Sequence, residues 1–292
     1  MDSILKAEHP AITPTELRSV PIIDLRGKTP TNAKYTWSSL KGFRDMSTVT
    51  DIIMHHSGMS KLSSVAYDDI TWINRIATAH INSTKNIPGG DPGFPYALFV
   101  RNGKLYVVND VNYLTYGVSD HNVQSVHICV DGDYANYDKL ADQDRKALYA
   151  AYFVVKAALP AFKNLFSHKE LAPTSCPGYD MAQVRSYIDN VEEQMDYNAS
   201  QSADRVTAYA FAERVDDLGK RLTDPKWGPE ARRKVMLLAP AIKETAGDAR
   251  TAESIVARVT DLYKKALSGN FADEATRKLL ICADAGKEFG LI

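Results

Sequence analysis

The spacing of apolar residues predicts alternating strands and helices in the first two thirds of the chain. Short apolar runs at residues 49–55 and 125–130 are typical of buried strands. Over residues 67–81 the apolar residues recur at intervals of three and four, which predicts a helix with one apolar face. Residues 142–158 predict a longer helix that Pro160 limits. Strands and helices in this order indicate an α/β domain with a mixed central sheet flanked by helices.

A β-hairpin is the sharpest local prediction within this domain. Two apolar runs, residues 96–101 and 104–109, are joined by Asn102 and Gly103. The favoured two-residue hairpin turn needs a positive φ at both positions, and asparagine and glycine are the residues that adopt it most readily. Two further elements complete the domain, a short strand end at residues 165–168 and a helix at residues 180–195.

The first 45 residues contain four prolines among polar residues. This pattern predicts an extended lead-in that wraps the following domain, with one short strand near residues 20–25.

The sequence after residue 195 has a different character. Residues 196–204 are small and polar, which predicts a linker. Four segments with apolar residues at helical spacing follow, and together they predict a small all-α bundle over residues 205–292. Those segments are residues 205–222, 229–244, 252–267 and 273–285. We therefore expect an α/β domain at residues 1–195, a linker, and a helical domain.

Composition and charge restrict the class of partner. Of the 292 residues, 45% are hydrophobic and 24% charged, which is typical of a globular protein. A net charge of −1 gives no global basic field, so nucleic acid is not an expected partner. No apolar run reaches the roughly 20 residues that a membrane-spanning helix needs, so membrane insertion is not expected either. Oligomeric state is not readable from these features.

Cysteine usage and the first residues indicate the compartment. The three cysteines, an odd number at wide spacing, do not form a disulfide framework, which fits a reducing compartment. Cys129 lies in an apolar run and is expected to be a buried small side chain. The N-terminus lacks the basic and apolar regions of a secretory signal, so we expect the protein to be held in a cytoplasm.

Histidine and cysteine residues suggest a metal site. His55 and His56 end the first apolar strand, and they point to opposite faces, so only one of them can join a given site. His168 and Cys176 lie in a segment with loop character, which can curl two ligands onto one ion. Structural zinc sites have four protein ligands, whereas catalytic sites have three and an open position. Convergence of these residues would therefore favour a zinc hydrolase.

Two other metal chemistries match part of the same residue pattern. His168 and Glu170 fit the His-x-Glu half of a zinc deaminase signature, but Tyr179 stands three residues after Cys176, so the Cys-x-x-Cys half is missing. A copper site that adds Met181 would imply electron transfer.

Several motifs in chain order resemble one known family. They are Met-His-His-Ser at 54–57, Phe-Pro-Tyr-Ala-Leu-Phe at 94–99, Ser-Val-His-Ile-Cys at 125–129, Ser-His-Lys-Glu at 167–170 and Thr-Ser-Cys-Pro-Gly at 174–178. Over residues 48–187 the chain resembles the zinc N-acetylmuramoyl-L-alanine amidases, which share a fold with peptidoglycan-recognition proteins and many bacteriophage endolysins. The last motif is the most specific.

The resemblance implies a set of site residues. It makes His55, His168 and Cys176 the ligands of a zinc ion, with His56 behind the strand. It also implies catalytic roles for Tyr96 and Thr174.

Two further residues, and two differences from the family's pattern, concern the active-site cleft that the resemblance implies. His80 and Asn122 match positions that line or support it, although a structural role is as good an interpretation. Most relatives have a glycine where this chain has His127, which needs more room or faces another way. Some relatives carry a glutamate base where Cys129 stands, so the identity of the general base stays open.

The resemblance also implies a function. It implies hydrolysis of the amide bond between N-acetylmuramic acid and L-alanine in bacterial peptidoglycan, by a phage endolysin that waits in the host cytoplasm until lysis. The domain at residues 1–195 would be catalytic, and residues 205–292 are assigned to cell-wall binding, with stabilisation or dimerisation as the alternative. The alternative functions are a peptidoglycan-binding protein without catalysis and a wall-recycling amidase.

Overall fold

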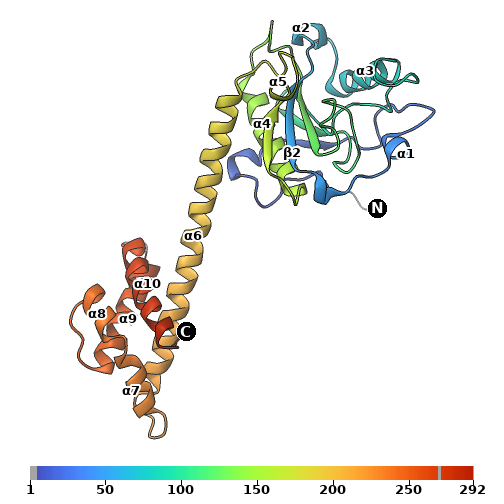
Figure 1. Ribbon diagram of the computed structural model, residues 1–292. Coiled ribbons are helices and arrows are strands. Elements are labelled where there is room, and N and C mark those ends of the chain that lie inside the picture. The colour runs from blue at the N-terminus through green and yellow to red at the C-terminus, as the bar shows by residue number, and fades with distance from the viewer. Residues whose placement is uncertain (1–4, 269–270, 292) are drawn as a thin grey trace. The chain divides into compact units, whose positions relative to one another are not determined.

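The computed structural model describes residues 5–268 and 271–291. The chain forms two compact units, Met1–Asp189 and Asn190–Ile292. Figure 1 shows strands and helices in the first unit and helices in the second. Among the described residues, no helix has both the length and the apolar character needed to cross a bilayer.

A six-stranded mixed sheet forms the centre of the first unit. Its order is β1-β4-β3-β5-β2-β6. Only β3 and β4 pair in antiparallel fashion, and the other neighbours are parallel. The strands are β1 (Ile22–Asp24), β2 (Asp51–His56), β3 (Leu98–Arg101), β4 (Lys104–Val107), β5 (Ser125–Val130) and β6 (Asn164–Ser167). The predicted α/β class with a mixed central sheet flanked by helices is confirmed.

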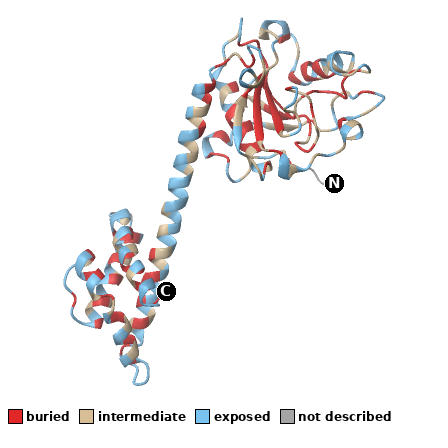
Figure 2. Cartoon of the chain, viewed as in Figure 1, coloured by how far each residue is buried: buried red, intermediate tan, exposed pale blue. Residues whose placement is uncertain are grey.

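The two faces of the sheet are covered by different helices. α3 (Asp69–Ile81) places Trp72 and Ile73 in one apolar cluster with Phe99 and Cys129. α4 (Asp142–Ala158) packs against β2, β3, β4 and β5, and ten of its residues are buried. Side chains alternate between the faces of a strand, and His55 pairs with Cys129, so His55 lies on the α3 face. Figure 2 shows the buried strands between these layers.

The predicted hairpin is confirmed. Asn102 and Gly103 have φ values of 49° and 71°. Both lie in the left-handed region that this turn requires, which explains why this local signal could be interpreted without the rest of the fold. The turn is also anchored to α3, because the Asn102 side chain donates a hydrogen bond of 2.7 Å to Asp69.

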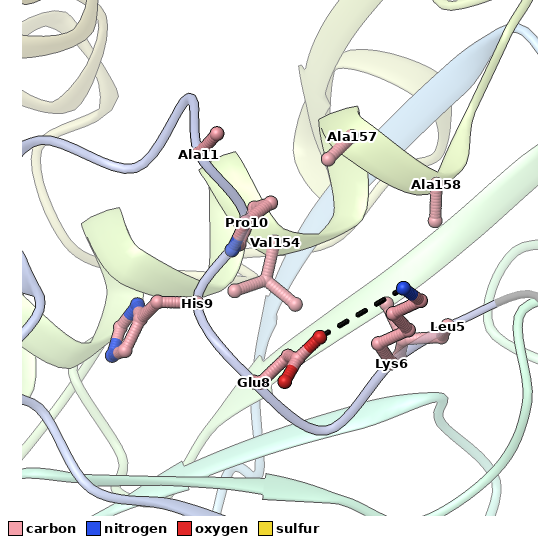
Figure 3. A pocket seen from close by; sticks show the side chains of 9 residues that line it. All are labelled: Leu5, Lys6, Glu8, His9, Pro10, Ala11, Val154, Ala157 and Ala158. Atoms are coloured by element: carbon pink, nitrogen blue, oxygen red, sulfur yellow. Dashed lines mark ion pairs between the residues drawn. The ribbon is translucent and has the colours of Figure 1, made fainter.

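The lead-in contains the strand β1 that the sequence predicts, but much of the rest of it forms turns and bends, not an extended segment. It also has a 3-10 turn at Thr15–Leu17 and the helix α1 (Trp37–Lys41). Its first described residues cross α4 and enclose a cavity of about 360 Å³ lined by Val154, Ala157 and Ala158 (Figure 3). His9 fixes this crossing through a 2.8 Å contact between its Nε2 and the Val20 carbonyl. Two short elements follow α1, a 3-10 turn at Met46–Thr48 and α2 (Lys61–Ser64). The short helix α5 (His168–Leu171) also belongs to this unit.

The second unit is helical, as predicted. Its helices are the C-terminal part of α6 (Met181–Lys220), α7 (Gly228–Met236), α8 (Ala239–Ala246), α9 (Ala252–Leu267) and α10 (Ala272–Glu288). Phe211, Val235, Ile255 and Leu279 are among the fully buried residues of its own apolar core. The single helix predicted at residues 229–244 is wrong, because the structure divides it into α7 and α8. Pro240 accounts for the break, since proline lacks an N–H and clashes with the carbonyl four residues earlier.

Residues 196–204, where the sequence predicts a linker, lie within the continuous helix α6. Small polar residues suggested a break, but neither glycine nor proline occurs between Gly178 and Gly219. Alanine, serine and glutamine are compatible with a helix, so nothing in this segment ends it. All of residues 189–207 are described and none is buried.

Candidate metal centre

His55 lies near the carboxyl end of β2, beside β6. These two strands are parallel, and Met54 pairs with Ser167, the last residue of β6. The next residue in each segment is a histidine, His55 in β2 and His168 directly after β6. Their rings lie 4.8 Å apart between centroids. The parallel register therefore brings together two histidines that are far apart in the sequence.

A capping box holds His168 at the first position of the short helix α5 (His168–Leu171). Glu170 accepts hydrogen bonds from the backbone and hydroxyl of Ser167, at 2.6 and 2.7 Å, and from Arg185 at 2.6 Å. Burial opposes ionisation, yet these hydrogen bonds lower the pKa of Glu170 to about 2. Glu170 is therefore an ionised structural residue, which argues against the deaminase role that its position after His168 suggested.

The loop after α5 folds back and brings Cys176 to His55. The Cys176 carbonyl accepts a hydrogen bond of 2.8 Å from the Lys169 backbone, and the Cys176 backbone donates one of 3.2 Å to Thr174 Oγ1. The backbone N–H of His56 points at Cys176 Sγ, 3.3 Å away. The ring of His56 turns elsewhere, where its Nδ1 accepts a hydrogen bond from the Tyr134 backbone.

His55, His168 and Cys176 form a cluster in which one ligand atom from each residue lies within 4.8 Å of the others. Cys176 Sγ and His55 Nδ1 are 3.8 Å apart. In a tetrahedral zinc site, bonds of about 2.3 Å to sulfur and 2.0 Å to nitrogen place these atoms about 3.5 Å apart. The donor set and its spacing fit a zinc ion with three protein ligands and an open fourth position.

The surroundings control the charge of the ligands. Burial, followed by the neighbouring histidines, lowers the pKa of His55 well below its usual value, so the imidazole is in the neutral form that binds metal. Burial raises the pKa of the Cys176 thiol to about 11, and the N–H of His56 partly opposes this effect. The thiol therefore has to release a proton when a metal binds.

Tyr96 and Thr174 lie beside the cluster. The half-buried Tyr96 ring is 5.0 Å from the His55 ring between centroids. Thr174 is exposed, and because its oxygen accepts from the Cys176 backbone, its O–H can donate.

His80 and Asn122 contribute to a cavity of about 450 Å³ that Tyr96 also lines. His80 contacts Asp91 at 2.9 Å. The Asn122 side-chain oxygen accepts hydrogen bonds from the backbones of Gly117 and Val118, at 2.8 and 2.9 Å. The structure thus gives both residues contacts that shape the loops of this cavity.

His127 is a neighbour of the cluster that the sequence did not assign to the site. Its Nδ1 lies 3.0 Å from His55 Nε2, and its side chain is completely buried. Burial and the nearby Arg44 cation lower the pKa of His127 to about 3. The sequence contained part of this information. His55 and His127 each lie on a strand that was predicted, and alternate residues of a strand face the same side of the sheet. What the sequence lacked was the register between those strands.

No family model and no curated protein matches the sequence. Several solved structures are similar at low identity. An endolysin N-acetylmuramoyl-L-alanine amidase from Clostridium intestinale is 15% identical, with a TM-score of 0.43, over 59% of this chain and 98% of its own. The Ph2119 endolysin of a Thermus scotoductus bacteriophage is 21% identical, with a TM-score of 0.39, over 56% of this chain and 97% of its own. Drosophila PGRP-LB is 23% identical, with a TM-score of 0.38, over 48% of this chain and 81% of its own. Because these values are low, the function proposed below rests on the side chains of this chain.

Removal of a ligand is expected to remove the metal. Cys176→Ser and His168→Ala should each lower the zinc content from about one ion per chain to well below one, because two ligands bind zinc much more weakly than three. Elemental analysis of the purified proteins measures this. Cys129→Ala is the matched control, since it removes a buried thiol that lies in the apolar cluster. Wild-type zinc content in both ligand variants would show that the site is wrong.

Proposed function

We propose that this protein is a zinc-dependent peptidoglycan hydrolase that cleaves the amide bond between N-acetylmuramic acid and L-alanine. The observation that carries the proposal is the convergence of His55, His168 and Cys176 within 4.8 Å. These residues come from motifs that resemble those of the zinc amidases, and three ligands leave the open position that a catalytic zinc needs. Because the motifs also resemble those of phage endolysins, we place this activity in host lysis.

The residues around the cluster suit this reaction. When bound, zinc lowers the pKa of a coordinated water to about 7 and polarises the carbonyl to be cleaved. We assign to the hydroxyls of Tyr96 and Thr174, which lie beside the cluster, the donation of hydrogen bonds to the oxygen that gains negative charge. Burial raises the pKa of Tyr96 well above its usual value, so the phenol keeps the proton that it donates. We assign Glu170 a structural role, because its Oε2 accepts hydrogen bonds from Ser167 and Arg185.

The main alternative is a peptidoglycan-binding protein without catalysis. Such proteins typically lack one of the zinc ligands, commonly the cysteine. In this chain Cys176 is present and faces His55 at 3.8 Å. The complete ligand set favours an enzyme.

We propose a second role for the helical unit, which is to hold the enzyme on the cell wall. A tether raises the local concentration of an enzyme whose substrate is an insoluble polymer. The unit has its own core, and its exposed aromatic side chains include Trp227 and Phe271, at 52% and 76%. Aromatic side chains are amphipathic or apolar groups with a large contact area, and we assign these two to ligand contact.

Purified bacterial cell walls test the activity. The zinc-loaded protein is expected to release new free amino groups of L-alanine, and to produce no new reducing sugar ends, because it cuts an amide and not a glycosidic bond. Both products can be quantified by chemical labelling of the soluble and insoluble fractions. Cys176→Ser should release neither. A wild-type protein that binds the walls but releases no amino groups would support the non-catalytic alternative.

Loss of the Tyr96 hydroxyl separates catalysis from metal binding. Tyr96→Phe is expected to lower the rate of amino-group release by about 100-fold while zinc stays bound, as for the loss of one oxyanion donor. Tyr67→Phe is the control, because it removes a hydroxyl from a tyrosine whose ring stacks on Trp72, 5.6 Å away between centroids. Full activity of Tyr96→Phe would exclude the donor role.

Sedimentation with cell walls tests the tether. A fluorescent fusion of residues 190–292 should sediment with purified walls, and residues 1–189 should sediment much less, because only the former carries the proposed binding surface. Phe271→Ala should weaken sedimentation of the fusion. If residues 190–292 remain in solution while the whole chain sediments, the wall-binding role belongs to the first unit.

A further inference from the structure

We propose that His127 is a positioning residue, which holds His55 in the tautomer and orientation that present Nδ1 to the metal. A series of hydrogen bonds that runs from the candidate metal centre to a backbone carbonyl supports this role. The inference rests on the metal centre of the proposed function but not on its substrate.

The chain of hydrogen bonds has a defined direction. At its far end the Ser125 hydroxyl lies 2.6 Å from the His121 carbonyl, which can only accept, so the Ser125 hydroxyl donates its one proton there. Ser125 Oγ must then accept from His127 Nε2, which is 3.3 Å away. With its proton on Nε2, His127 can only accept at Nδ1.

The same direction fixes His55. His127 Nδ1 accepts at 3.0 Å from His55 Nε2, so the proton of the His55 ring lies on Nε2. The lone pair of the ring is then on Nδ1, the nitrogen that faces Cys176 Sγ at 3.8 Å. The His121 carbonyl, at the far end of this series of hydrogen bonds, therefore selects the His55 tautomer that can bind metal.

The chain is protected from competing partners. The side chains of His55, His127 and Ser125 are all completely buried. The two hydrogen bonds that His127 makes, to His55 and to Ser125, are therefore shielded from water, and the bond from Ser125 to the His121 carbonyl is partly buried.

The fold also makes room for the His127 ring. A Cβ added to Gly117 would lie 2.4 Å from His127 Nδ1, which is too close for any side chain at that position. Asn122 fixes this loop by accepting hydrogen bonds from the backbones of Gly117 and Val118. The absence of a side chain at Gly117 therefore leaves the space that the His127 ring occupies. This is the extra room that the sequence predicted His127 would need.

Ligand histidines generally donate their second ring N–H to a fixed acceptor, and loss of that acceptor costs about 10- to 100-fold in metal affinity or activity. In this chain the acceptor is another imidazole. His127 should therefore matter for zinc binding although it does not contact the ion.

Three variants at two positions test the role by zinc affinity, measured by competition with a chromophoric chelator. His127→Phe keeps a ring but removes both nitrogens, and should weaken zinc binding by about 10- to 100-fold. His127→Asn retains an acceptor for His55 and should recover most of this loss. Ser125→Ala should weaken binding on its own and add no further loss to His127→Phe, because Ser125 acts only through His127.

A second readout follows the proton itself. In the zinc-loaded wild type, NMR should show a slowly exchanging ring N–H of His55, and His127→Asn should retain it while His127→Phe loses it. Val126→Ala is the control for stability, since Val126 is fully buried on the same strand but faces the other side of the sheet. It should lower the melting temperature and leave zinc affinity unchanged.

The outcomes separate this inference from the proposed function. Wild-type zinc affinity and an unchanged ring N–H in His127→Phe would overturn the positioning role, even if the wild type hydrolyses peptidoglycan. Additive losses from Ser125→Ala and His127→Phe would also overturn it. Weakened zinc binding in His127→Phe would support it, even if the wild type hydrolyses nothing.

Discussion

The parallel pairing of β2 with β5 and β6 is the constraint on which the rest of the site depends. Parallel neighbours end at the same edge of a sheet, so His55 and His168 meet there although 113 residues separate them. A slip of one residue would turn His55 to the α4 face, away from Cys176 and Tyr96. Side chains on both faces of β2 and β5 are buried, so such a slip would exchange the residues packed against α3 with those packed against α4 and disrupt both layers of the core. The core and the metal centre are thus set by the same register.

Burial makes this edge of the sheet unfavourable for positive charge on an imidazole. His55 and His127 are completely buried, and each has a pKa below its usual value for that reason first. Arg44 adds a fixed cation nearby, held by the carbonyls of Val111 and Asn122 at 2.8 and 2.9 Å. Burial lowers the pKa of Arg44 to about 10, but the group still stays charged at neutral pH. His55 is therefore kept in the neutral form that binds metal, first by burial and then by the neighbouring histidines.

Local patterns predicted most of the fold, and long-range geometry accounts for what they missed. The hairpin was predicted from its turn residues, β5 from a short apolar run and the end of α4 from Pro160. Each of these signals lies within a few positions of the sequence. The division between α7 and α8 was missed because apolar periodicity continued through Pro240. The three residues of the candidate metal centre could be named from their motifs. The contact between His55 and His127 could not, because it requires the register of two strands that lie 72 residues apart.

The metal centre is organised by partners that belong to the protein itself. Ser167 and Glu170 cap the helix that begins with His168. The backbone of His56 holds the Cys176 sulfur, and His127 holds the ring of His55. Ligands that are already oriented lose little conformational freedom when they bind, so less of the binding free energy is spent on ordering them. The free energy needed to order these side chains is instead spent when the chain folds, because folding buries two imidazoles and requires a glycine at residue 117. The ordering of these side chains before any metal binds is the physical basis of the proposal that the cluster is a metal site.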